Sequence, residues 1–161
     1  AERILLFIDG SEACITAAQY AIVLAKQFEA ELSAIYVVNV SVLKDLVKTK
    51  IFIKMEEMDY EQDLEEDGRR YLNYVSELAG RKGIQLETFL VKGVVNKEVI
   101  HKINENDIDL LIMGELDQVQ SRTDSHHDEA ELLFRKCSSS VLIVKDEEKA
   151  EELYEMLDDV Q

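Results

Sequence analysis

The sequence predicts one α/β domain, built on a five-stranded parallel, doubly wound sheet with helices on both faces. Short apolar segments with the composition of buried strands recur along the chain, at residues 3–8, 32–40, 84–91, 109–114 and 141–144. Helical patterns separate these segments, and this alternation is typical of parallel strands joined by crossover helices. The chain of 161 residues has no proline and no linker-like tract, which favours one domain over two.

The first unit should consist of a buried strand, a tight turn and a helix. Residues 3–8 are followed by Asp9-Gly10-Ser11, a sequence typical of a turn. We expect Ser11 to cap the helix that follows. One face of that helix is expected to be buried, and it is formed by Ala17, Ala21, Leu24, Ala25 and Phe28.

The middle of the chain should add a second buried strand at residues 32–40, a long charged helix and an edge strand. The helical pattern in residues 41–82 is clearest in its second half, and Gly83 ends it. Its apolar stripe consists of Tyr71, Leu72, Val75, Leu78 and Ala79. The acid-rich residues 56–67 are expected to form a solvated helix face. Residues 84–91 alternate apolar with polar side chains, which indicates a strand at the edge of the sheet.

The last part of the chain should complete the sheet and end in a helix. After Gly93, a short helix aligns Val95, Val99 and Ile103. The elements that follow are a strand at 109–114, a polar loop at 115–125, a helix at 128–137, a turn at 138–140 and a strand at 141–144. The acidic residues after them carry Ala150, Leu153, Leu157 and Val160 at helical spacing. We therefore expect a domain over residues 1–145 and an acidic helical tail over 146–161. The tail should dock on the domain or on a partner or, alternatively, be partly frayed.

Composition excludes several classes of function. A formal net charge of −16 opposes binding to nucleic acids and to anionic membrane surfaces. The apolar runs are too short to cross a bilayer, and no signal-like segment precedes the first strand. Cys14 and Cys137 are the two cysteines and lie far apart in the sequence, as in proteins of reducing compartments. We therefore expect a soluble cytoplasmic protein without a nucleic-acid or membrane partner.

Short sequences in a defined order carry a family resemblance. They are ILLFIDGSE at residues 4–12, YVVN at 36–39, Gly93 with the helix after it, DIDLLIMG at 107–114 and VLIVK at 141–145. In this order and spacing, residues 3–145 resemble the universal stress protein family. The resemblance implies a Rossmann-like sheet similar to that of adenine-nucleotide α-hydrolases. It also implies a homodimer paired through the last strand, here from Val141 to Val144.

The resemblance points to a glycine-rich phosphate motif that is altered in this chain. ATP-binding members carry Gly, two residues, Gly, nine residues and then Gly-Ser or Gly-Thr, so that backbone amides approach the phosphates. Here Gly114 is the first glycine, and Asp117, His127 and Asp128 stand at the other positions. A carboxylate about 4 Å from a phosphate opposes binding by ~1–4 kcal/mol. Phe7 also stands where ATP-binding members often have a proline, so ordinary ATP binding is not expected.

The adenosine half of the family site is better preserved. Asp9, Val37, Met113 and Gly114 occupy positions that contact adenine or ribose in ATP-binding members. They form the candidate adenosine pocket. The alternative interpretation is structural: Asp9 caps the first helix, while Val37 and Met113 are core residues.

No motif predicts a metal site or a catalytic residue. The polar group Asp124, His126, His127, Asp128 and Glu129 lacks the spacing of metal ligands. It is better explained as a solvated loop and helix start, where Ser125 and Asp128 resemble a capping box, with an adventitious divalent site as the alternative. His101 is expected at the surface. No nucleophile elbow, Cys–His arrangement or Walker lysine is present in the sequence.

The sequence thus favours a non-catalytic stress-response or regulatory module without a cofactor. It should form a homodimer and act through protein contacts. The alternative is a regulatory switch that binds ATP or another adenosine compound through a non-standard phosphate site. An α-hydrolase-like enzyme is a third hypothesis, for which the sequence offers no nucleophile or base.

Overall fold

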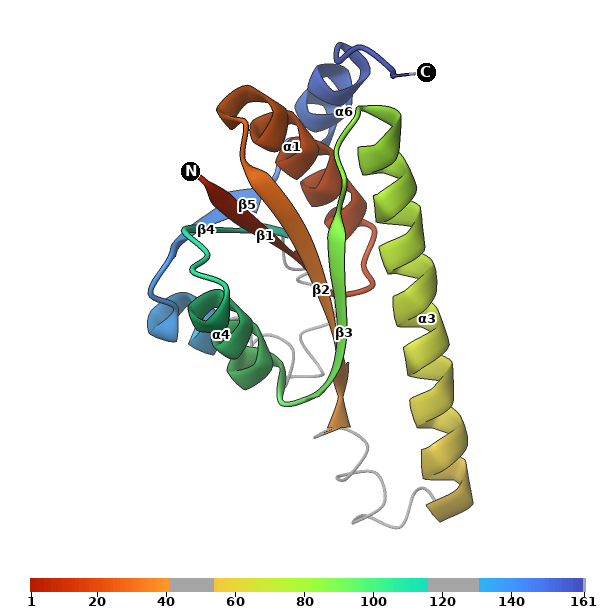
Figure 1. Ribbon diagram of the computed structural model, residues 1–161. Helices are drawn as coiled ribbons and strands as arrows, with labels where there is room; N and C mark the ends of the chain where they lie inside the picture. The colour runs from red at the N-terminus through yellow and green to blue at the C-terminus, as the bar shows by residue number, and fades with distance from the viewer. Residues whose placement is uncertain (41–53, 116–130, 161) are drawn as a thin grey trace.

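The computed structural model describes residues 1–40, 54–115 and 131–160, and confirms the predicted fold (Figure 1). Five parallel strands form one sheet in the order β3-β2-β1-β4-β5. The strands are β1 (Arg3–Ile8), β2 (Glu31–Asn39), β3 (Glu87–Gly93), β4 (Leu110–Gly114) and β5 (Ser140–Val144). Among the described residues, the helices are α1 (Ala13–Phe28), α3 (Lys54–Arg81), α4 (Val95–Glu105) and α6 (Glu147–Glu155), and residues 131–136 are also helical.

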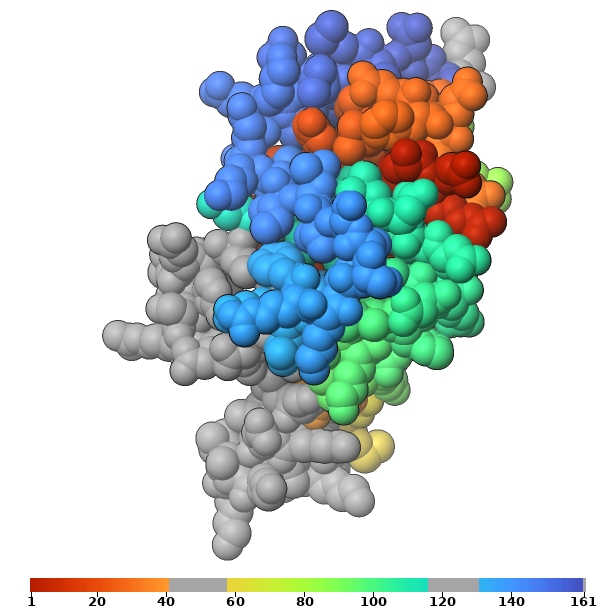
Figure 2. Space-filling view, turned by 90° about the vertical axis from the view of Figure 1, so that its left-hand side faces the viewer, coloured from red at the N-terminus to blue at the C-terminus, as the bar shows by residue number. Residues whose placement is uncertain are grey.

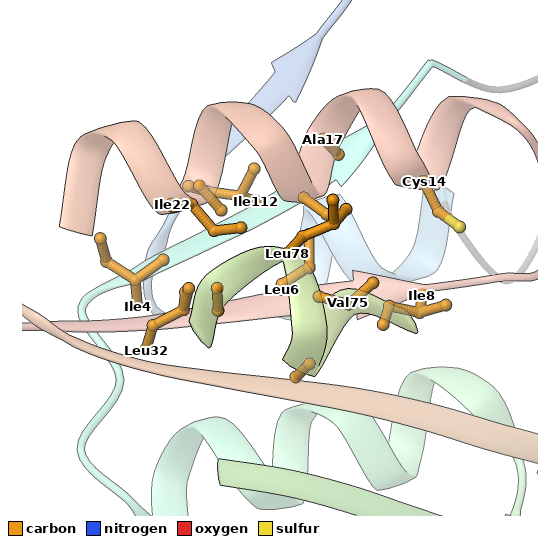
Figure 3. Close-up of a cluster of buried hydrophobic side chains, with 14 of the residues drawn as sticks. Ile4, Leu6, Ile8, Cys14, Ala17, Ile22, Leu32, Val75, Leu78 and Ile112 are labelled. Atoms are coloured by element: carbon orange, nitrogen blue, oxygen red, sulfur yellow. The ribbon is translucent and has the colours of Figure 1, made fainter. Parts of the chain in front are cut away.

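The alternation of side chains along β1 divides the core into two layers. Ile4, Leu6 and Ile8 point to one face of the sheet, where they pack with residues of α1 and α3 (Figure 3). Residues of α6 belong to the same layer. Leu5 and Phe7 point to the other face, where they pack with residues of α4 and of the helical segment 131–136. Successive strand residues face opposite sides, so a continuous apolar run supplies both layers at once. Within the described residues, no helix is long and apolar enough to cross a membrane.

Two details of the first unit were predicted wrongly. Ser11 does not cap α1: the helix starts at Ala13 with Glu12 at the N-cap and no capping side chain, and the Ser11 hydroxyl bonds back to Asp9 instead. Phe28 is 51% exposed. It is the last residue of α1, and the buried face of that helix runs through Ala18 and Ile22, which the sequence pattern had not included.

The edge position predicted for the third strand is correct, but its start is not. β3 is the terminal strand of the sheet, and its pairing with β2 begins only at Glu87 opposite Ser33. Gly83, with φ of +82°, ends α3 as expected. Ile84 and Leu86 then pack against the core between helix and strand, which explains their alternation outside the ladder.

The C-terminal helix α6 packs on the domain beside α1, on the face that also carries α3 (Figure 1). Ala150 and Tyr154 are its buried residues. The Tyr154 hydroxyl donates to the Leu78 carbonyl over 2.7 Å. Lys82, only 3% exposed, donates through Nζ to the Leu157 carbonyl at 2.9 Å and lies 2.5 Å from the Asp159 carboxylate.

The apolar stripe predicted for the tail agrees only in part with the residues that are buried in the structure. Leu153 and Leu157 are partly buried against the core, whereas Val160 is 52% exposed. The Val160 amide donates to the Arg81 carbonyl at 2.9 Å, so the chain beyond α6 follows the end of α3. Backbone pairing therefore holds this part of the tail, and the apolar periodicity stops at Leu157.

Candidate functional site

Two of the candidate residues, Asp9 and Gly114, lie where the strand order reverses, at the carboxyl ends of β1 and β4. Ligands in open parallel sheets bind at this position, because neighbouring crossovers leave the sheet on opposite faces there. Asp9 follows β1 directly, and Gly114 is the last residue of β4. Because β1 and β4 are neighbours in the sheet, the two residues lie at the same edge, as the family resemblance implies for one pocket.

Asp9 organises the turn between β1 and α1. Its Oδ1 accepts hydrogen bonds from the Ser11 amide at 2.9 Å and from the Ser11 hydroxyl at 2.6 Å. Gly10 between them has φ of +84°, a conformation that favours glycine. The Tyr71 hydroxyl of α3 donates to the Gly10 carbonyl at 2.8 Å. Asp9 therefore stabilises the turn before α1 and is not the helix cap that we considered as an alternative.

Two ionisable groups below this turn are held neutral. Burial, with a smaller contribution from the Asp9 carboxylate, raises the pKa of the Cys14 thiol to about 12. Burial likewise raises the pKa of Tyr36 to about 12, assisted by Asp67, Tyr71 and Asp9. Both groups keep their protons at neutral pH, so neither supplies a thiolate or phenolate nucleophile.

A cavity of about 140 Å³ opens beside Asp9, between the ends of β1 and β2 and the helices α3 and α4. Asp9 and Val37 line it, together with the rings of Phe7, Tyr36 and Tyr60. None of the described residues around this cavity is a lysine or arginine. The arrangement accommodates a small apolar ring near one carboxylate, and it offers a phosphate no cation.

The other two candidate residues do not line this cavity. Met113 is 1% exposed and belongs to the core layer under α4, which supports the structural interpretation of this residue. Gly114 lies directly against the start of α1: a Cβ atom there would stand 2.5 Å from the Ala13 carbonyl oxygen. The structure therefore brings Asp9 and Val37 together, and gives Gly114 a packing role next to them.

A larger hollow of about 750 Å³ lies at the opposite edge of the sheet, at the amino ends of β2 and β3. Lys26, Glu29, Glu31 and Glu87 are among the residues around it. Because parallel sheets place ligands beyond the carboxyl ends of their strands, the smaller cavity beside Asp9 is the better candidate despite its size.

Several sequence predictions fall outside the described residues. These are the motif positions Asp117, His127 and Asp128, and their neighbours Asp124, Ser125, His126 and Glu129. His101 is at the surface as expected, with a side chain that is 69% exposed and 3.4 Å from Glu105. Within the part of the chain that is described, no three potential metal ligands come together.

Sequence reasoning missed the contribution of α3 to the cavity. The acid-rich stretch is not a wholly solvated face, because Lys92 of β3 lies 3.2 Å from Glu61 and 2.5 Å from Glu65. Tyr60 and Leu64, one residue before each of these carboxylates, line the cavity. The signal was present in the sequence as a spacing of four residues through Tyr60, Leu64 and Gly68, which is one face of a helix.

Comparison with known proteins places this fold in a family. The model of the universal stress protein family matches residues 1–145. Universal stress protein MJ0531 of Methanocaldococcus jannaschii is 30% identical over 148 residues, which cover 92% of this chain and 84% of that protein.

Solved structures agree with this match. A protein of the family from Burkholderia pseudomallei is 24% identical, with a TM-score of 0.68 over 89% of this chain and 95% of the other. The universal stress protein from Archaeoglobus fulgidus in complex with dAMP is 11% identical, with a TM-score of 0.62 over 90% and 98%. From the matched sequence and the parallel sheet of five strands, we conclude that the chain belongs to the universal stress protein family.

Proposed function

We propose that this protein is a non-catalytic regulatory module of the stress response, which does not bind ATP in the ordinary way and acts as a homodimer through protein contacts. The observation that carries the proposal is the cavity beside Asp9. Its volume of about 140 Å³ is well below the ~300–1,000 Å³ typical of small-molecule sites. Its one carboxylate, with no described lysine or arginine around it, disfavours a polyphosphate.

The altered motif after Gly114 supports the same conclusion from the sequence. Asp117 and Asp128 introduce negative charge at two of the three positions that depart from the family pattern. Each carboxylate near a phosphate would oppose binding by ~1–4 kcal/mol, and 1.4 kcal/mol is a factor of ten. The neutral Cys14 and Tyr36 are likewise consistent with a protein that is not an enzyme.

We predict that ATP, titrated by calorimetry with and without magnesium, produces no binding at concentrations up to about 1 mM. The matched variant Asp117→Gly/His127→Gly/Asp128→Ser restores the family pattern and removes two carboxylates. It should gain at least about 30-fold in ATP affinity, because two repulsive contacts of ~1 kcal/mol or more each are relieved. Micromolar binding by the unaltered protein would contradict the proposal.

The homodimer is proposed to form through β5. This strand ends the described sheet, and Ile143 on it is 36% exposed. Figure 2 views the side of the molecule on which the C-terminal part of the chain, in blue, reaches the surface. A terminal strand presents backbone donors and acceptors that a second copy would satisfy.

Replacing Ile143 by glutamate should therefore convert the dimer to a monomer of 18.4 kDa in light scattering after size exclusion. The charge would be buried without a partner at the interface. Phe28→Glu is the matched control, because Phe28 is 51% exposed and is the last residue of α1, not a residue of β5. A protein that is monomeric before any substitution would refute this part of the proposal.

A nucleotide-binding switch is the second candidate, since a family member has been solved in complex with dAMP. Asp9 and Val37 come together here at the positions that the family resemblance assigns to adenosine. Denaturing the purified protein and identifying any released small molecule by chromatography and mass separates the two candidates. A released adenine nucleotide would favour the switch.

A further inference from the structure

The cavity beside Asp9 is covered by the half of α3 that comes first in the chain. Tyr60 and Leu64 reach the cavity, and Gly68, Leu72 and Val75 continue the same side of the helix toward the core. Residues four apart lie above one another on a helix, so a single face of α3 serves both as core and as cover.

Gly68 sets how closely this cover lies on the sheet. A Cβ atom at this position would stand 2.5 Å from Cδ1 of Tyr36 and 2.8 Å from Cδ1 of Leu90. Real side chains do not approach so closely, so only glycine lets α3 lie this near to β2 and β3. Because α3 lies so close to the sheet at Gly68, Leu64 and Tyr60, one and two turns before Gly68, lie over the end of β2.

A second contact holds the same half of α3 in place. The Lys92 ammonium of β3 bridges Glu61 at 3.2 Å and Glu65 at 2.5 Å, the residues next to Tyr60 and Leu64. These ion pairs raise the pKa of Lys92 and lower that of Glu65. A single exposed ion pair contributes little to stability. One cation shared by two carboxylates on adjacent turns, however, favours one position of the helix on the sheet.

The space under this cover is about the size of one aromatic ring. Cavities of about 150 Å³ accommodate a benzene-sized molecule, and this one measures about 140 Å³. Tyr60 is 38% exposed, so part of its ring lines the cavity and part meets solvent. Phe7 and Tyr36 surround the same space from the strands, and both are buried.

We propose that Tyr60 is a specificity-determining residue, which closes the cavity beside Asp9 to nucleosides by occupying its mouth from α3. The inference rests on the proposed function, because it explains in steric terms why an adenosine compound is not accepted. It concerns the nucleoside part of a ligand, whereas the altered motif after Gly114 concerns the phosphates. The two effects are independent and are tested with different ligands.

The test is a calorimetric titration with adenosine, which lacks phosphates and so does not depend on the motif. The unaltered protein should not bind adenosine up to about 1 mM, and Tyr60→Ala should bind it at least about tenfold more tightly than that limit. Tyr60→Phe keeps the ring and should remain closed. Tyr74→Ala is the matched control, since Tyr74 lies on the same helix and is 46% exposed.

Circular dichroism melting is recorded for each variant. If Tyr60→Ala does not fold, Tyr60→Val is titrated instead, because it also removes the ring. Adenosine binding by a folded ring-deleted variant, absent in Tyr60→Phe and Tyr74→Ala, supports the inference. No gain in a folded variant, or equal binding by the unaltered protein, overturns it. Micromolar ATP binding by the unaltered protein would instead refute the proposed function, so the two failures are distinguishable.

Discussion

Replacing Tyr154 by alanine is expected to lower the free energy of unfolding by about 3–5 kcal/mol, the range found for large buried aromatic residues. Tyr154 is 3% exposed and packs with Ala150 in the core layer below α1. Its hydroxyl donates to the Leu78 carbonyl at 2.7 Å, inside the protein. The Lys82 ammonium lies 4.7 Å from the centre of its ring. The substitution removes all three interactions and leaves a cavity.

The reason for so large an effect is that Tyr154 joins α6 to α3. Lys82 is buried and finds its partners in the tail, at the Leu157 carbonyl and the Asp159 carboxylate. A buried cation without such partners is costly, so displacement of α6 would force Lys82 to rehydrate. Loss of the aromatic ring should therefore loosen the tail as a unit.

Chemical denaturation followed by circular dichroism measures this effect. Tyr154→Phe is the matched control: it keeps the ring, loses one hydrogen bond and should cost about 1 kcal/mol. If Tyr154→Ala changed the free energy of unfolding by less than about 1 kcal/mol, α6 would not be docked as described, and the frayed tail would be the better description.

Replacing Gly114 by alanine is expected to destabilise the protein by about 3 kcal/mol, at the upper end of the range for overpacking. The added Cβ would stand 2.5 Å from the carbonyl oxygen and 2.6 Å from the carbonyl carbon of Ala13. These are backbone atoms at the start of α1, so no side-chain rotation relieves the contact. Either α1 or the end of β4 must move.

Gly80→Ala is a control of opposite sign. Gly80 lies in α3, and a Cβ there would meet nothing within 4 Å. Alanine favours the helix more than glycine, so this variant should be more stable by up to about 1 kcal/mol. Thermal unfolding of both variants tests the pair. Equal stability of Gly114→Ala and the unaltered protein would show that β4 and α1 are not in close contact.

The close contact of Gly114 with Ala13 also bears on how the family motif should be interpreted. The family resemblance assigns this glycine to the first position of the phosphate pattern, and assigns the other positions to Asp117, His127 and Asp128. Its contact with Ala13 is sufficient to require glycine without any bound phosphate. Retention of Gly114 is therefore no sign of ATP binding.

The fold could be predicted from the sequence, because the patterns that specify it are local. The apolar run of β1 with its Asp9-Gly10-Ser11 turn, and the helical face of Val95, Val99 and Ile103, depend only on backbone periodicity. Local order also allowed the family to be named, since short strand-and-turn sequences recur at fixed spacing. The bounds of β3 and the role of Ser11 were wrong, because pairing partners and competing hydrogen bonds decide both.

The set of residues around the cavity beside Asp9 could not be predicted from the sequence, because it depends on tertiary packing. Tyr36 lies on β2 opposite Ile8 and comes near Asp9 through the pairing of β1 with β2. Tyr60 lies on α3, far from Asp9 in sequence, and reaches the same cavity where Gly68 lets α3 approach the sheet. Tyr154 was likewise not among the tail residues that we predicted to be buried, since its burial depends on the Leu78 carbonyl of another helix. A local pattern records the geometry of a few neighbouring residues. A cavity or a buried polar contact instead depends on packing between segments that are distant in the chain, which no local periodicity encodes.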